Sequence, residues 1–280
     1  MTVTALSPPH LDLDLITALT GGTISRTDVK VDRPDRTVTI VTITGGTEDT
    51  AVVKTSRTEL GDPAAIRHLA GAHAPIQRIL GTGHVEGIDW ACLSFIPGVP
   101  LTVADRTACL EAGRWLRCIH QVPAPPPPLT YHMRMDDWVD DVTGWWRTSG
   151  AGLQSLPGFL DAYRMLRPRI AGADSATYLF DGRAEHFIVD PAGHLAGIID
   201  VADTARGDFA MDIAVIADGD QEMADQVLTG YRPTSDELEH VRAVFGFYTR
   251  LRHLSAAKWH DRVGNAAESA RILARAGLAE

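Results

Sequence analysis

Apolar residues follow a strand-like pattern in the first third of the chain and a helix-like pattern in most of the remainder. The first third contains three β-branched runs separated by short polar turns, which predict a three-stranded antiparallel meander, and two further apolar runs that predict additional strands. The five predicted strands are 27–31, 37–43, 50–55, 76–79 and 88–96. A helix is expected before them at 9–19, because carboxylates alternate there with Leu and Ile and two glycines follow.

Helical spacing of apolar residues predicts four helices in the remainder: 103–121, 212–231, 235–264 and the final stretch to residue 280. Ser235 and the acidic residues after it are typical of a helix N-terminus. The proline run at 124–128 must be extended, since consecutive prolines exclude both helix and central strand. The pattern therefore predicts an α+β fold with its sheet in the N-terminal part.

A short hairpin is predicted where two β-branched runs, 187–189 and 198–199, flank a Pro-Ala-Gly turn signal. Asp181 precedes the hairpin, His186 borders its first strand and Asp200 follows its second, so these side chains would share one small volume. Magnesium takes hard oxygen ligands and usually one or two protein carboxylates. Phosphoryl transfer needs a separate carboxylate that orients the accepting hydroxyl. The pattern therefore indicates a site for a metal ion and a phosphate group.

The stretch around this hairpin resembles the catalytic core of the aminoglycoside phosphotransferase family, whose members are relatives of protein kinases and choline kinases. That family carries His-Gly-Asp, four residues and Asn, then a strand, a turn and Ile-Asp-Trp-x-Asp/Glu-Ala ahead of Gly-Asp-Pro-x-x-Asp-Leu. The matching residues keep this spacing and are Leu179-Phe180-Asp181, His186, Ile199-Asp200-Val201-Ala202-Asp203-Thr204 and Gly207-Asp208-Phe209-Ala210-Met211-Asp212. The resemblance implies a two-lobed protein-kinase-like fold, with a nucleotide-binding lobe over 1–97 and a catalytic and acceptor-binding lobe over 98–280.

The chain departs from the family pattern at three places. Leu179-Phe180 replaces His-Gly, His186 replaces the metal-binding Asn, and Val201 replaces Trp. Histidine binds divalent cations through its neutral imidazole, although it is a softer ligand than an amide oxygen. Macrolide phosphotransferases, a branch of the same family, also carry His at this position. The alternative for His186 is a side chain that only satisfies hydrogen bonds within the hairpin.

By resemblance, the residues around the hairpin take defined roles. Asp181 would orient and deprotonate the acceptor, and His186 and Asp200 would hold Mg²⁺. Arg183 would neutralise charge on the transferred phosphoryl group, unless it is simply a solvated arginine. Asp203 would assist at the metal or on the acceptor side. Asp208 and Asp212 would brace the catalytic loop, and His120 would be a packed or capping residue at the end of its helix.

The N-terminal lobe would bind ATP or GTP, and the sequence does not choose between them. Lys54, at the end of a predicted strand, matches the lysine that holds the α- and β-phosphates. Its acidic partner would be Asp62, with Glu59 as the alternative. Backbone groups at Ser94 and Ile96 would bind the purine edge, and 33–36 would form the nucleotide-positioning loop.

An acidic, tryptophan-rich segment after the prolines would contact the acceptor through Asp136, Asp140 and Trp145. Carboxylates beside aromatic faces suit a cation. The alternative is a solvated helix face with Trp138 and Val142 turned inward. The expected reaction is phosphorylation of an antibiotic, either an aminoglycoside, a basic peptide of the tuberactinomycin type or a nucleoside antibiotic. A macrolide acceptor and an inactive pseudokinase that binds nucleotide or drug are the alternatives.

Composition narrows the remaining function classes. The chain has 280 residues, 45% of them hydrophobic, and a formal net charge of −10. It has no Lys/Arg cluster that could follow a phosphate backbone, which argues against nucleic acid as a partner. Three cysteines without Cys-x-x-Cys spacing argue against a disulfide framework. No leader or apolar span is evident, so we expect a cytoplasmic protein, either monomer or homodimer, with no membrane partner.

Overall fold

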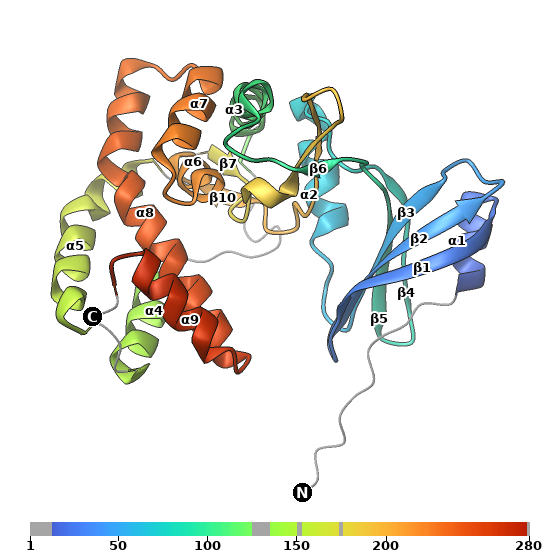
Figure 1. The fold of residues 1–280 in the computed structure, drawn as a ribbon, viewed down its shortest axis with the longest axis horizontal. Coiled ribbons are helices and arrows are strands. Elements are labelled where there is room, and N and C mark those ends of the chain that lie inside the picture. Colours follow the sequence, from blue (N-terminus) through green and yellow to red (C-terminus); the bar gives the residue numbers. More distant parts are fainter. Residues whose placement is uncertain (1–12, 125–134, 150–152, 174–175, 279–280) are drawn as a thin grey trace, which may run out of the picture.

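The computed structural model describes residues 13–124, 135–149, 153–173 and 176–278, and it confirms the α+β class. Figure 1 shows an N-terminal sheet on one side and a larger group of helices on the other, joined by the chain around β6 (Val99–Pro100). β5 ends at Ser94 and β6 begins at Val99, on either side of the predicted boundary between the lobes. The division at 97/98 itself stays a prediction.

The N-terminal sheet has five antiparallel strands in the order β1-β2-β3-β5-β4. Their bounds are β1 Thr23–Asp32, β2 Arg36–Thr44, β3 Thr50–Ser56, β4 Ile79–Val85 and β5 Ile88–Ser94. The meander and the strand within 88–96 are thus confirmed. The strand predicted at 76–79 is wrong, because Ile76 forms only an isolated bridge to Ile198 and β4 begins at Ile79. Most of β4 is an exposed edge strand in which apolar and polar residues do not alternate, so its sequence does not predict a strand.

The two faces of this sheet have different roles. Helix α1 (Leu13–Thr20) covers one face, where Ile16 packs with buried residues of the sheet such as Val41 and Val53. Successive side chains on a strand point to opposite faces. Val52 and Lys54 of β3 therefore face away from α1 and border an interlobe cavity. Helix α2 (Asp62–Leu69) follows β3 and carries Asp62 at its start.

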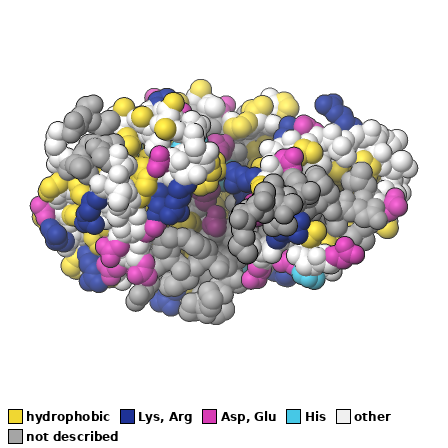
Figure 2. Space-filling view, turned by 90° about the horizontal axis from the view of Figure 1, so that it is seen from below, with side chains coloured by type: hydrophobic (Ala, Val, Ile, Leu, Met, Phe, Trp, Pro, Cys, Tyr) yellow, Lys and Arg dark blue, Asp and Glu magenta, His cyan; other side chains and the backbone are white. Residues whose placement is uncertain are grey.

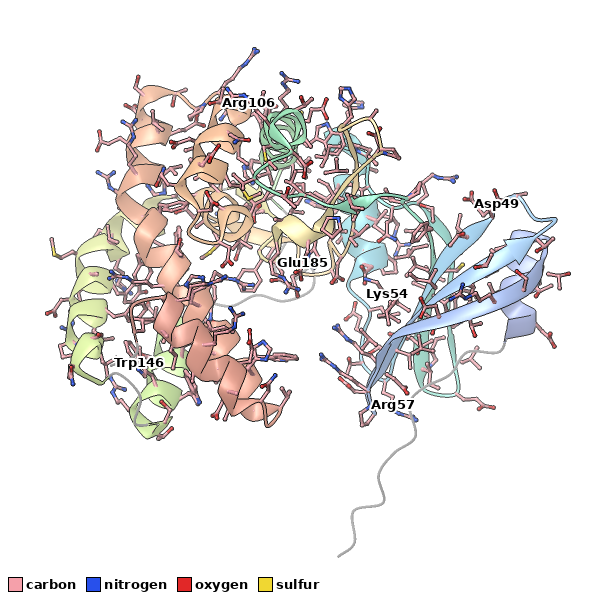
Figure 3. The ribbon with its side chains drawn as sticks, in the orientation of Figure 1. Asp49, Lys54, Arg57, Arg106, Trp146 and Glu185 are labelled. Carbon is pink, nitrogen blue, oxygen red and sulfur yellow. The ribbon has the colours of Figure 1, made fainter. Side chains whose placement is uncertain are left out.

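The C-terminal lobe is built around α8 (Ser235–Arg262), which packs against α4, α5, α6 and α9. The other helices are α3 Arg106–His120, α4 Met135–Ser149, α5 Leu156–Gly172, α6 Ala210–Ala217, α7 Gln221–Tyr231 and α9 Ala266–Arg275. Trp146 of α4 is fully buried in this lobe (Figure 3). Helices α3 and α7 approach closely at Gly113 and Gly230, where an added Cβ would lie 2.0 Å or less from a carbonyl oxygen of the facing helix. Buried residues of these helices and of the predicted hairpin form one hydrophobic core.

Two helix predictions need correction. The helix expected over 212–231 is divided, because Asp218 and Gly219 have φ of 48° and 87° and end α6. Asp220 then caps α7 by accepting a hydrogen bond from Met223 N–H. The N-cap of α8 is Thr234 rather than Ser235, and Glu237 completes a capping box with it.

Two small sheets carry the stretch around the predicted hairpin. β6 pairs with β8 (Phe187–Val189), which pairs in turn with β9 (Leu195–Ile198), so the predicted hairpin is confirmed. β7 (Ala176–Tyr178) pairs with β10 (Ala205–Gly207) and brings the ends of this stretch together.

Residues 9–12 of the predicted first helix and 125–134, which include most of the proline run, lie outside the described residues. Among the described residues, no helix combines the length and apolar composition that crossing a bilayer requires.

Candidate active site

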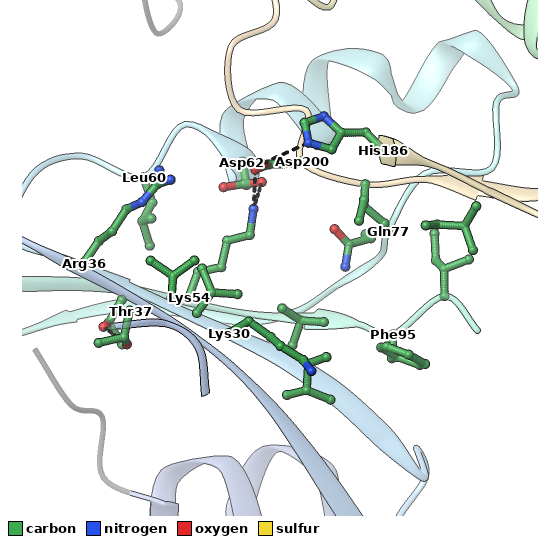
Figure 4. A pocket seen from close by; sticks show the side chains of 18 of the residues that line it. Lys30, Arg36, Thr37, Lys54, Leu60, Asp62, Gln77, Phe95, His186 and Asp200 are labelled. Carbon is green, nitrogen blue, oxygen red and sulfur yellow. Dashed lines mark hydrogen bonds and ion pairs between the residues drawn. The ribbon is translucent and has the colours of Figure 1, made fainter. Parts of the chain in front are cut away.

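A cavity of about 320 Å³ lies between the N-terminal sheet and the hairpin of β8 and β9. Its walls are mostly apolar and come from both lobes: Val38, Ile40, Val52, Ile188 and Ile199. Figure 4 shows Lys54 pointing toward Asp62 and Asp200, with Gln77 and Phe95 on the side away from Arg36. Figure 2 shows the hollow between the lobes with acidic and basic side chains at its edge, and Figure 3 shows Glu185 facing it from the C-terminal lobe.

Lys54 joins the two lobes at the centre of this cavity. Its Nζ donates hydrogen bonds of 2.7 Å to Asp62 Oδ1 and 2.8 Å to Asp200 Oδ1. Burial alone would lower the pKa of Lys54, but the two carboxylates outweigh it and hold that pKa above its usual value. The lysine is therefore a fixed, fully charged ammonium group.

Asp62, and not Glu59, is the acidic residue that contacts Lys54. It lies in the first turn of α2, with Pro63 behind it, and the residue is buried. A carboxylate at a helix N-terminus is favoured by the helix dipole. The 2.7 Å contact shows that the short aspartate side chain is long enough to reach the lysine.

Asp200 follows β9 in a left-handed conformation with φ of 55°, which turns its carboxylate back into the cavity. Burial would raise the pKa of Asp200, but Lys54, with a smaller contribution from Arg36, lowers it to about 2. Asp200 Oδ2 lies 3.7 Å from His186 Nε2. Asp200 is thus ionised at any pH near neutrality.

His186 is held in one tautomer by its surroundings. Its Nδ1 lies 2.8 Å from the carbonyl oxygen of Asp181, which can only accept, so Nδ1 must carry the proton. The lone pair of Nε2 then faces Asp200 and Arg183 Nη2, at 3.7 and 3.3 Å. This neutral imidazole beside a carboxylate has the donors that a divalent cation needs. Among the described residues, no group of three or more His, Cys, Asp or Glu is close enough to enclose a metal ion.

Asp181 lies on a loop that Asp212 holds in place. The fully buried Asp212 carboxylate accepts hydrogen bonds from the backbone N–H groups of Leu179 and Phe180, at 2.7 and 3.0 Å. It also contacts His120 Nε2 at 3.0 Å. Phe180 has φ of 66°, a conformation that a non-glycine residue adopts only when its surroundings impose it. The expected bracing role of Asp212 and the packed position of His120 are confirmed.

Asp208, expected to share the bracing role, does not contact this loop. Its carboxylate contacts His240 Nε2 and accepts a hydrogen bond from the Tyr248 hydroxyl, both at 2.7 Å. Both partners belong to α8. Asp208 therefore ties the start of α6 to α8.

Arg252, which no sequence pattern indicated, contacts the Asp181 carboxylate from α8. Its guanidinium group lies 5.4 Å from the Phe180 ring centre and 5.9 Å from that of Trp138. Arg183 approaches the other carboxylate oxygen of Asp181 at 3.3 Å and pairs with Glu185 at 2.7 Å. Two arginines therefore flank Asp181.

Asp203 borders a second cavity, of about 450 Å³, together with Glu59, Arg33 and Trp259. Burial, with the carboxylates of Asp181 and Asp200, raises the pKa of Asp203 to about 6. The Arg33 guanidinium lies 5.1 Å from the Trp259 ring centre, so the loop at 33–36 touches α8 at the edge of this cavity.

The acidic, tryptophan-rich segment forms α4, and several of its side chains have partners within the lobe. Arg167 binds both carboxylate oxygens of Asp136, at 2.7 and 2.6 Å, and Tyr163 donates to the same carboxylate. Trp145 Nε1 donates to Asp261 at 2.8 Å, while Asp140 is exposed. Trp138 and Val142 are buried, as the solvated-face alternative expected. Acceptor contact by Asp136, Asp140 and Trp145 stays a prediction.

Ile96 borders the first cavity, and each backbone group of Ser94 already has one hydrogen-bond partner. Ser94 N–H donates to the Arg78 carbonyl at 2.8 Å, and Ser94 O accepts from Gln77 Nε2 at 2.9 Å. Sequence reasoning missed Gln77, since a polar residue in a short apolar run carries no distinguishing pattern.

A family model described as "Phosphotransferase enzyme family" matches residues 42–244. The fold is similar to that of aminoglycoside 2'-phosphotransferase-IIIa in its GDP complex, with a TM-score of 0.74, 13% identity, and coverage of 94% of this chain and 96% of that one. It is also similar to choline kinase from Cryptosporidium parvum Iowa II (TM-score 0.61, 12% identity, 95% and 98% covered). Macrolide 2'-phosphotransferase from Brachybacterium faecium, as apoenzyme, gives a TM-score of 0.56, 15% identity, and 94% and 98% coverage. No curated protein matches the chain.

Proposed function

The chain belongs to the phosphotransferase enzyme family, and we propose that it transfers the γ-phosphoryl group of a nucleoside triphosphate to a hydroxyl group of a small-molecule antibiotic. The observation that carries this proposal is Lys54, held between Asp62 and Asp200 at the centre of an interlobe cavity that His186 also borders. A fixed cation, two ionised carboxylates and a neutral imidazole meet there, and Asp181 lies on the loop next to them. These are the groups that phosphoryl transfer needs.

The nucleotide would occupy the cavity of about 320 Å³. Its base would lie between the apolar side chains of the sheet and of the hairpin. Its phosphates would reach Lys54, whose ammonium group neutralises their charge. Asp62 positions that ammonium group, so that the lysine needs no rearrangement when the nucleotide arrives.

His186 Nε2 and Asp200 would hold Mg²⁺, and the fit rests on the donor set described above. Magnesium usually keeps several water or phosphate ligands and needs few protein ligands. When bound, the ion would supply charge stabilisation on the transferred phosphoryl group. The Asp181 carbonyl, by fixing the tautomer of His186, keeps the Nε2 lone pair available.

Asp181 would act on the acceptor. Its carboxylate orients the acceptor hydroxyl and takes its proton as the hydroxyl oxygen forms a bond to the γ-phosphorus. The bond from the γ-phosphorus to the bridging oxygen breaks, and the nucleoside diphosphate leaves with that electron pair. Arg183, which lies 3.3 Å from Asp181, would offset charge that develops on the phosphoryl oxygens.

Two observations support a cationic antibiotic as the acceptor. Solved structures with the same fold include phosphotransferases named for aminoglycosides. The second cavity adjoins Asp181 through Asp203 and offers the Asp203 and Glu59 carboxylates beside the Trp259 ring, a combination that attracts cations. Asp140, exposed on α4, would extend this surface. A macrolide acceptor and an inactive protein that only binds nucleotide or drug remain the alternatives.

Mass spectrometry of an antibiotic panel tests the proposal directly. The purified protein is incubated with Mg²⁺, ATP or GTP, and aminoglycosides, tuberactinomycins, nucleoside antibiotics and macrolides. One acceptor should gain the mass of a phosphoryl group, and Asp181→Asn should lower that turnover by about 10²-fold or more while nucleotide binding persists. Unchanged turnover in Asp181→Asn would refute the role of Asp181. Nucleotide binding without any phosphorylated product would favour the inactive alternative.

A further inference from the structure

Gln77 lies just before β4, and its side chain borders the same cavity as Lys54. The residue is 4% exposed. Its Nε2 donates a hydrogen bond of 2.9 Å to the carbonyl oxygen of Ser94, at the end of β5. The Ser94 hydroxyl oxygen in turn accepts a hydrogen bond of 2.8 Å from Arg78 N–H. Gln77 and the end of β5 therefore form one fixed unit at this side of the cavity.

The contact with Ser94 determines how the Gln77 amide is turned. A carbonyl oxygen only accepts hydrogen bonds, so the NH₂ group must face Ser94 and Oε1 must lie on the opposite side of the amide. Figure 4 shows the Gln77 oxygen directed into the cavity, on the side of Lys54. No described residue donates a hydrogen bond to Oε1. The cavity wall thus carries a fixed acceptor without a partner.

The position of Gln77 relative to Lys54 determines which part of a nucleotide it would meet. A nucleotide whose phosphates lie at Lys54 places its base at the other side, where Figure 4 shows Gln77 and Phe95. There the backbone N–H of Ile96 has no partner among the described residues. The base edge would therefore meet one donor, Ile96 N–H, and two acceptors, the Ser94 carbonyl and Gln77 Oε1.

We propose that Gln77 selects adenine over guanine, so that the phosphate donor is ATP. The inference rests on the proposed function, because it requires a nucleotide in this cavity. The 6-amino group of adenine has two N–H bonds, one for the second lone pair of the Ser94 carbonyl and one for Gln77 Oε1. Adenine N1 accepts from Ile96 N–H. Every polar group at this side of the cavity then has a partner.

Guanine in the same position leaves these groups unpaired. Its 6-oxo group faces two acceptors, and its N1–H faces the Ile96 N–H. Turning the Gln77 amide would bring NH₂ to the 6-oxo group, but it would also bring Oε1 against the Ser94 carbonyl. A site built to bind an N–H group rejects an analogue that lacks it, since buried polar groups then stay unsatisfied. Gln77 thus acts against guanine in both orientations of its amide.

Calorimetric binding of nucleoside diphosphates tests this inference without an acceptor or turnover. The probes, with Mg²⁺, are ADP, GDP and the diphosphate of purine riboside, which keeps the adenine ring but lacks the amino group. The wild-type protein should bind ADP about tenfold or more tightly than either of the others. Equal affinity for ADP and purine riboside diphosphate, or tighter binding of GDP, would overturn the inference. Binding of none of the three would instead overturn the proposed function, and with it this inference.

Gln77→Met removes the amide at nearly constant volume. It should reduce the preference for ADP over purine riboside diphosphate to the part that the Ser94 carbonyl alone supplies, with little change in affinity for purine riboside diphosphate. Gln226→Met is the matched control, because Gln226 is also buried and donates from Nε2 to a carbonyl oxygen, that of Val103, at 3.2 Å. Gln226 lies on α7 and should leave the preference intact. A Gln77→Met protein that is less stable but keeps the preference for ADP would show that Gln77 has a structural role only. If this variant does not fold, equal binding of ADP and purine riboside diphosphate by the wild-type protein would still overturn the inference.

Discussion

Arg252, on the long helix α8, donates a hydrogen bond to the carboxylate of Asp181, on the loop before the β8–β9 hairpin. The guanidinium group also lies over the rings of Phe180 and Trp138, so its position is fixed by packing as well as by charge. Because one carboxylate oxygen is bound by Arg252, the other is turned toward Arg183. The contact thus sets the orientation in which Asp181 would meet an acceptor hydroxyl.

Arg252→Ala should therefore lower kcat by about 10- to 100-fold with little effect on nucleotide affinity, because a misoriented base loses the benefit of its placement. Millimolar guanidinium should restore part of the rate, which loss of structure alone would not allow. Arg250→Ala is the control, since Arg250 is exposed on the same helix. A rise in turnover in Arg252→Ala would show that the arginine blocks the site instead of orienting it.

Nucleotide affinity distinguishes Asp62 from Glu59 as the functional partner of Lys54. Asp62→Asn should weaken nucleotide binding by about tenfold, because the lysine loses one of the two charges that fix it. Glu59→Gln should leave binding unchanged, since Glu59 does not contact Lys54 in the described structure. Calorimetry with ADP gives both affinities. Equal effects of the two substitutions would contradict a specific role of Asp62.

The cation preference tests His186 as a metal ligand. His186→Asn replaces imidazole by an amide oxygen, which is a harder ligand and favours Mg²⁺ over Mn²⁺. The ratio of ADP affinity in Mn²⁺ to that in Mg²⁺ should therefore fall by about threefold or more in this variant. His194→Asn is the control, because His194 is exposed and contacts Glu111. An unchanged ratio in His186→Asn would support the alternative that His186 only satisfies the Asp181 carbonyl.

The sequence was sufficient to predict those site residues that a local element, such as a hairpin or a strand, brings to the site. Asp181, His186 and Asp200 meet because a short hairpin joins them, and the spacing of a hairpin is readable. Lys54 was found because a strand ends at a fixed place before the catalytic stretch. Arg252 and Gln77 reach the site from a distant helix and from a loop, through packing of the whole fold. No local pattern of charge or hydrophobicity marks such residues.

The helix break at Asp218 shows a further limit of pattern reading. The apolar spacing continues from α6 into α7, so hydrophobicity alone predicts one helix. The break depends on Asp218, whose carboxylate contacts His253 and Arg275. These partners lie in α8 and α9, and their contacts support a left-handed residue that helix propensity alone does not predict.

Stability should depend on pH through Asp203. Its pKa in the folded protein is about 6, whereas an aspartate in an unfolded chain titrates near 3.9. The folded state thus binds a proton more tightly, and stability falls as pH rises from about 4 to about 6. Asp203→Asn should raise the melting temperature at pH 8 and have little effect at pH 4. Asp35→Asn, at an exposed site, should show no such difference, and an equal effect of Asp203→Asn at both pH values would contradict the raised pKa.

Substitutions of Asp212 and Asp208 can distinguish an effect on the stability of the protein from an effect on the geometry of the loop that carries Asp181. Both are buried and accept hydrogen bonds, but only Asp212 binds the backbone of the loop that carries Asp181. Asp212→Asn places an NH₂ group or a single oxygen against two backbone N–H donors, which should cost about 1–3 kcal/mol. Asp208→Asn should cost a similar amount, because it disturbs the contacts with His240 and Tyr248.

The two variants should differ in catalysis at a temperature where both are folded. Asp212 binds the N–H of Phe180, whose φ is 66°, so we expect Asp212→Asn to let the loop relax and to move Asp181 away from the acceptor. We expect kcat to fall by about tenfold or more in Asp212→Asn and to stay near the wild-type value in Asp208→Asn. Melting curves and turnover measured on the same preparations give both quantities. Equal losses of kcat in the two variants would mean that lobe stability, and not the brace on Phe180, controls the position of Asp181.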